Sequence, residues 1–213
     1  MRSKLILGLA VIIIVASVGA GVTLAIFTDQ DYNSENIFSA GTVDIAADRN
    51  LGDPIPGPMF YTTVEQGTVP DGGDALNPTG VWWPGRTEYR NLDVRNMGSL
   101  QVRINRVSAE ITSINGADPQ PPLSESFAAN MHVKIYVAGH PQTKILYEGS
   151  LANLLTIQDC IHKPVIAPFT NLWPPMVQLV YEVTMLPQAG NDLQGIVPVV
   201  SFSVYAEQTK NNP

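Results

Sequence analysis

The sequence predicts an all-β protein, a two-sheet jelly-roll-like sandwich with long loops rich in proline and glycine. Short runs of Val, Ile, Thr and Tyr with period-two alternation recur through residues 38–213. Stretches rich in Gly, Pro and Asn separate these runs. Helical periodicity is absent after residue 27, which argues against a helical bundle or a doubly wound fold.

Three runs alternate most clearly and predict strands at residues 131–137, 177–185 and 200–206. Weaker runs predict further strands at residues 42–46, 59–64, 92–95 and 144–147. Between them, breaker residues predict a turn at residues 96–99 and loops at residues 48–58, 67–80, 115–125 and 164–175. One short helix is expected after Ser150, which can cap it and place Leu151, Leu154 and Leu155 on one face.

The run over residues 100–111 changes parity in its middle. Its apolar residues are even-numbered and then odd-numbered: Leu100, Val102 and Ile104, followed by Val107, Ala109 and Ile111. A strand with one buried face cannot change parity without an inserted residue. The pattern therefore predicts a β-bulge near Asn105 and Arg106, or two strands joined by a tight bend.

The N-terminus has the features of an export signal. Arg2 and Lys4 precede a run of 23 uncharged residues over 5–27, and Thr23 and Ala25 are small. We expect a signal peptide over residues 1–25, cleaved between Ala25 and Ile26, then a free segment over 26–37 and the sandwich over 38–213. An uncleaved anchor is the alternative, because about 20 apolar residues span a bilayer. In both cases the body of the protein is expected outside the cytoplasm, secreted or at the cell surface, with membrane contact only through an uncleaved signal segment.

Composition narrows the range of partners. The formal net charge of −7 argues against nucleic acid and against a basic lipid-binding patch. Cys160 is the only cysteine, so an internal disulfide is impossible. It is expected to be a small buried hydrophobe, with an intermolecular bridge as the less favoured interpretation.

No arrangement in the sequence predicts catalysis, a metal or a cofactor. The two-histidine helical motif of zinc proteases is absent. His132 and His140 are too far apart on an extended chain to share an ion. Cys160 and His162 share strand parity and could approach each other, but no third residue is identifiable to orient them as a catalytic pair.

Two further groups of residues allow a binding role beside a structural one. Three tryptophans could form a sugar-stacking platform, but their neighbouring prolines favour packing of loops on the sandwich: Trp82, Trp83 and Trp173. Three loop carboxylates could bind Ca²⁺, but their spacing matches no known calcium loop and favours solvated side chains: Asp71, Asp74 and Asp118.

Three blocks of sequence occur in an order found in a known family. They are AIFTD at 25–29 followed by FSAGTVDI at 38–45; WPG at 83–85 followed by VRNMGSL at 94–100; and NDLQG at 191–195 followed by FSVYAEQ at 202–208. Together the blocks resemble the TasA/camelysin (CalY) proteins exported by Gram-positive bacteria, which have distant archaeal relatives. The loops at 48–80 and 112–128 are longer and richer in proline than this resemblance implies.

The resemblance implies a jelly-roll subunit of extracellular biofilm-matrix fibres, processed by a signal peptidase. In such fibres the N-terminal segment of one copy becomes a strand in the next, so the partner is the protein itself in a head-to-tail homopolymer. An exposed sheet edge can accept an extended segment in this way. The expected donor strand, with Phe27 and Tyr32 as anchors, comprises Ile26, Phe27, Thr28, Asp29, Gln30, Asp31 and Tyr32.

Other interpretations of the chain remain open. Residues 26–37 could instead be a disordered stub or pair within their own domain. The alternative functions are a cell-surface metalloprotease of the camelysin type and a monomeric surface adhesin.

Overall fold

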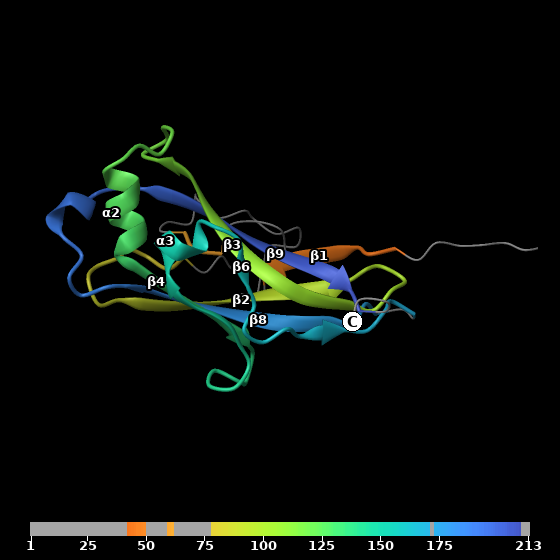
Figure 1. Cartoon of the computed structure of the whole chain (residues 1–213). Coiled ribbons are helices and arrows are strands. Elements are labelled where there is room, and N and C mark those ends of the chain that lie inside the picture. Colours follow the sequence, from red (N-terminus) through yellow and green to blue (C-terminus); the bar gives the residue numbers. More distant parts are fainter. Residues whose placement is uncertain (1–41, 50–58, 62–77, 171–172, 210–213) are drawn as a thin grey trace, which may run out of the picture. The chain divides into compact units, whose positions relative to one another are not determined.

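A computed structural model describes residues 42–49, 59–61, 78–170 and 173–209 (Figure 1). The predicted signal peptide, its cleavage point and the predicted donor strand lie outside these residues, as do most of the predicted loops over 48–58 and 67–80.

The described residues form two antiparallel sheets, which confirms the predicted all-β sandwich. Sheet A has five strands in the order β1–β2–β8–β4–β5. Their bounds are Ile45–Arg49 for β1, Thr87–Asn96 for β2, Met176–Met185 for β8, Met131–Val137 for β4 and Ile145–Ser150 for β5. Sheet B is built on β3 (Val102–Ile114), with β9 (Pro198–Gln208) along one side and the two-residue strands β6 (Gln158–Asp159) and β7 (Val165–Ile166) on the other.

The chain crosses repeatedly between the two sheets. The chain passes from β2 in sheet A to β3 in sheet B, then to β4 and β5 in A, β6 and β7 in B, β8 in A and β9 in B. Only the β1–β2 and β4–β5 pairs join strands adjacent in sequence. This crossing pattern gives the jelly-roll-like arrangement, and it places one apolar core between the sheets, centred on Val94, Ile104, Ile135 and Leu179.

The clearest alternating patterns in the sequence predicted strands at the correct positions. The prediction for residues 131–137 coincides with β4, and those for 177–185 and 200–206 lie within β8 and β9. The strand predicted at 144–147 corresponds to β5, which pairs with β4. The strand predicted at 92–95 is the second half of β2. Asp93 alternates with Leu92 and Val94 in the sequence, but all three side chains are buried.

The predicted bulge is confirmed. β3 is one strand through residues 102–114, so the alternative of two strands joined by a bend is wrong. Ile104 pairs with Ala206 and Arg106 with Tyr205, which leaves Asn105 as the extra residue. The insertion keeps both Ile104 and Val107 fully buried, as the change in parity required.

Two predictions near the N-terminus are wrong in detail. The first strand is Ile45–Arg49 rather than residues 42–46, because the ladder with β2 begins where Ile45 faces Asn96 and continues to Arg49 beside Leu92. The loop predicted from residue 48 therefore begins too early. Residues 59–61, the described part of the strand predicted at 59–64, form a bend.

Of the two α-helices in the described residues, one was predicted and the other was missed. Helix α3 (Leu151–Leu154) is confirmed, and the Ser150 hydroxyl accepts a hydrogen bond from the Asn153 amide at 3.2 Å. Leu155 is exposed rather than on the buried face. Helix α2 (Leu123–Ala129) was missed, because the predicted loop over 115–125 covers its first turn. The loop predicted over 164–175 likewise contains β7, a strand too short to leave a pattern.

Candidate strand-acceptor site

The outer edge of β9, which faces away from β3, is the first element of the candidate site. β9 pairs with β3 along nearly its whole length, from Val102 opposite Gln208 to Ile114 opposite Pro198. Within the part of the chain that the structure describes, no strand pairs with the outer edge of β9. The outer edge of a β-strand is where an added strand can hydrogen-bond.

Among the described residues, β9 is the last strand on its side of sheet B, whereas sheet A has further strands on that side. β9 lies across from β8, because the rings of Phe202 and Tyr181 have centroids 5.1 Å apart. In sheet A, β2 and then β1 follow beyond β8. A strand added at the outer edge of β9 would therefore lie over the inward faces of β2 and β1 (Figure 1).

A short piece of loop covers part of that inward face. The Arg90 guanidinium of β2 donates to the Met59 carbonyl at 3.1 Å. The Phe60 ring lies 6.1 Å from Trp82 and 6.2 Å from Phe202, centroid to centroid. These contacts place residues 59–61 beside β2 and Phe202, and the main-chain hydrogen bond of this described piece goes to Thr79 rather than to β9.

The inward side chains of β9 are incompletely covered. Val200, Phe202, Val204 and Ala206 pack against the core but remain partly exposed. On the opposing strand, Val107 is completely buried. The sequence already showed the alternation of these β9 residues, but not that the strand lies at the edge of a sheet.

The outward face of β9 is polar and tied to β3. Arg103 donates a hydrogen bond to the Glu207 carboxylate at 2.8 Å. This hydrogen bond is the main reason why the pKa of the Glu207 carboxyl is lowered. Arg106 lies 5.6 Å from the centroid of the Tyr205 ring, and the Tyr205 and Ser108 hydroxyls are 3.2 Å apart. These pairs fix the outward face, so the apolar side of β9 points into the sandwich.

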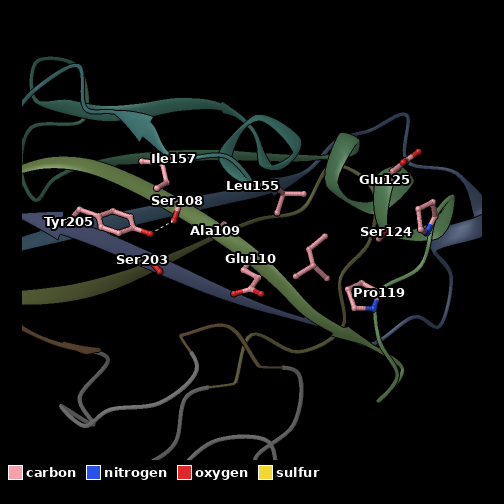
Figure 2. A pocket seen from close by; sticks show the side chains of 12 residues that line it. Ser108, Ala109, Glu110, Pro119, Ser124, Glu125, Leu155, Ile157, Ser203 and Tyr205 are labelled. Atoms are coloured by element: carbon pink, nitrogen blue, oxygen red, sulfur yellow. Dashed lines mark hydrogen bonds between the residues drawn. The ribbon is translucent and has the colours of Figure 1, made fainter.

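A shallow groove lies on the outward face of sheet B (Figure 2). Hydroxyls of Ser108, Ser203 and Tyr205 line it on the sheet, and Leu155 and Ile157 form one apolar wall. Figure 2 shows the Tyr205 hydroxyl directed at Ser108 along the sheet. The lining includes the carboxylate of Glu110 but no histidine or cysteine, so it holds none of the candidate nucleophiles.

Cys160 is confirmed as a small buried hydrophobe. Burial raises the pKa of its thiol to about 12, which makes it a poor nucleophile. The amide of Cys160 bonds to the Asn105 carbonyl in sheet B, whereas that of His162 bonds to the Ile145 carbonyl in sheet A. His132 lies in β4 opposite Ser150.

Metal and sugar sites were the other possibilities. The described ranges contain no group of three or more His, Cys, Asp or Glu residues that could hold a metal ion. Trp82 packs against Phe60, whereas Trp83 and Trp173 are 55% and 85% exposed. Asp118 is exposed in its loop, and Asp71 and Asp74 lie outside the described residues.

The donor residues predicted from the sequence cannot be placed against this site. Ala25 and the predicted donor strand over residues 26–32 lie outside the described residues. Of the helices in the described ranges, none has the length and apolar character to cross a bilayer. Comparison with known proteins found no protein-family model and no curated protein that matches the chain.

Proposed function

We propose that this chain is an exported structural subunit that polymerises head-to-tail into extracellular fibres. In this proposal the segment over residues 26–37 of one copy adds to the outer edge of β9 in the next. The observation that carries the proposal is the outer edge of β9, which has no strand partner among the described residues and an apolar inward face only partly covered. The resemblance of the sequence blocks to TasA/camelysin proteins supports the same function.

The dimensions of donor and acceptor agree. The proposed donor has 12 residues, from 26 to 37, and β9 has 11. Each main-chain hydrogen bond contributes about 1 kcal/mol net, and a strand of this length forms several. Burial of Val200, Phe202 and Val204 beneath the added strand would contribute about 25 cal/mol per Å² of apolar surface removed from water.

Polymerisation follows from the kind of contact. A donor at the N-terminus and an acceptor at β9 are different surfaces, so the contact is heterologous and does not close on itself in a pair. Cleavage after Ala25 would release the donor from the apolar segment before it. Removal of the signal peptide thereby becomes the trigger for assembly.

The first test compares two forms of the chain by electron microscopy. The form beginning at Ile26 should grow filaments, whereas a form lacking residues 26–36 should stay folded and form no filaments. Circular dichroism shows that the shortened form retains its β structure, and light scattering gives its mass. Filaments grown by the shortened form would rule out strand donation.

The second test uses a synthetic peptide with the sequence of residues 26–37. Added to the shortened form, it should raise the midpoint of thermal unfolding, since it binds only the folded state. Added to the form beginning at Ile26, it should stop filament growth by occupying β9. A peptide of the same composition in scrambled order is the control, and equal effects of the two peptides would show that the acceptor is not specific.

A further inference from the structure

The segment that follows α3 has a regular pattern of exposure. From residue 157 to residue 169, every odd-numbered residue is exposed and every even-numbered one is buried or half-buried. We name the exposed set the outer ridge: Ile157, Asp159, Ile161, Lys163, Val165, Ala167 and Phe169.

The backbone of this segment is fixed between the two sheets. Its outer parts bond to β3 and its middle bonds to β5, through four hydrogen bonds of 2.8–2.9 Å: Cys160 amide to Asn105, Ile104 amide to Pro164, Ile161 amide to Leu146 and His162 amide to Ile145. The even-numbered side chains, such as Cys160 and Ile166, pack into the core. The fold therefore accounts for the inward face of the segment, but not for the apolar character of the outer ridge.

The exposed surface of the outer ridge is unusually apolar. Ile161 is 77% exposed, Ile157 52% and Val165 51%. Single exposed apolar residues are common, but a contiguous group of them usually marks an interaction surface. Five of the seven side chains of the outer ridge are apolar, and the two others carry opposite charges.

Those two charges identify the partner. Asp159 and Lys163 stand two positions before and two positions after Ile161. A two-fold axis through Ile161 reverses the chain direction, so it brings Asp159 of each copy to Lys163 of the other and Ile157 towards Val165. The chain has a net charge of −7, so copies repel each other at long range, and matched charges at the contact would offset part of that repulsion.

We propose that the outer ridge is a self-complementary contact surface at which two copies of this chain associate about a two-fold axis near Ile161. The contact uses the side of the sandwich between β3 and β5, not the outer edge of β9. It goes beyond the proposed function and does not rest on it. In a fibre it would join subunits sideways.

Disulfide cross-linking of the full-length chain in a mild detergent tests the contact. The Ile161→Cys variant should form a covalent dimer on mild oxidation, because a residue near a two-fold axis meets its own copy. The Gln142→Cys variant, exposed in the turn between β4 and β5, is the control for random collision. Native Cys160 is buried and its thiol has a pKa raised to about 12, so it should not take part.

Charge reversal in the Ile161→Cys background tests the pairing. Asp159→Lys and Lys163→Asp should each lower the dimer yield about fivefold, because each replaces two attractive pairs by repulsive ones. The double reversal should restore the yield. Equal yields from the Ile161→Cys and Gln142→Cys variants, or yields unaffected by the single reversals, would overturn the proposal.

The design also separates this contact from strand donation. The full-length chain retains residues 1–25, so its donor segment has not been released by cleavage. If the form lacking residues 26–36 still made filaments, strand donation would be wrong while the cross-linking result would stand. Absence of the Ile161→Cys dimer would overturn the outer ridge contact alone.

Discussion

The two sides of the sandwich are completed differently. Between β3 and β5, the segment over residues 157–166 hydrogen-bonds to both sheets and closes the side. At the opposite side, sheet B stops at β9, and no described strand continues it over β2 and β1. The first side is bridged by main-chain hydrogen bonds to both sheets, whereas the outer edge of β9 has no strand partner among the described residues.

The burial of two paired valines differs between the two sides of the sandwich. Val107 and Val204 are register partners in β3 and β9, so they occupy the same level of sheet B. Val107 is completely buried, whereas Val204 is only half-buried. At this level of sheet B, the side chain on β3 therefore contributes more apolar burial to the isolated domain than its register partner on β9.

The largest effect is expected from truncating these two valines. Val107→Ala should lower the free energy of unfolding by about 2–3 kcal/mol, because it removes two buried carbons and leaves a cavity. Val204→Ala should cost about 1 kcal/mol, because water already reaches that side chain. Urea unfolding of the form lacking residues 26–36 measures both, and equal losses would remove the distinction between the two sides.

A smaller loss is expected where the chain enters β1. A Cβ at Gly98 would clash with the Thr42 carbonyl oxygen, so Gly98→Ala must displace residues 42–44. Their bonds with residues 97–100 would be lost, at a cost of about 2 kcal/mol. Ser99→Ala, which removes only the 3.0 Å bond from the Thr42 amide, is the matched comparison at about 1 kcal/mol.

Hydrogen exchange would show where Gly98→Ala weakens the structure. Gly98→Ala should speed exchange in β1 but leave β4 and β5 as they are. If protection of β1 were unchanged, the close approach of Gly98 to the Thr42 carbonyl would not be what holds the start of this strand.

The closed side should also show a dependence on alkaline pH. Burial raises the pKa of the Cys160 thiol from 9.0 to about 12, so the folded state retains a proton that the unfolded state loses. This contribution is complete below pH 9 and is lost as pH rises towards 12, with a slope approaching about 1.4 kcal/mol per pH unit.

The Cys160→Ala variant isolates this effect from the tyrosines. Burial also raises the pKa of Tyr136, Tyr147 and Tyr181, and these groups remain in both proteins. The difference in unfolding free energy between the native chain and the variant should therefore shrink above pH 9. A difference that stays constant up to pH 11 would show that the thiol ionises equally in both states.

The sequence predicted the parts of this fold that depend on local alternation. β4 and β8 bury alternate residues and β9 half-buries them, so their patterns were visible in the sequence. The change of parity in β3 located the bulge. Helix α2 was missed because Pro119, Pro121 and Pro122 suggested a loop. Proline is acceptable at the start of a helix, and Leu123 with Phe127 one turn later was the available indication.

The edges of the sheets could not be predicted from local patterns. The partner of β9 is β3, which lies far earlier in the sequence, and alternation does not reveal whether a strand has one neighbour or two. The same limit applies to β6 and β7, whose two residues each are defined by pairing with β3 rather than by composition. For this reason the donor was proposed from sequence, whereas the proposed acceptor and the outer ridge required the structure.

The position of β1 has a mechanical consequence. Residues 42–44 are bonded to residues 97–100, and β1 then pairs with β2 through five consecutive residues. In the proposed fibre, a force acting along the axis of β1 would load all these hydrogen bonds in shear at once rather than break them one after another. Their number would then set the tension that the start of the domain can bear.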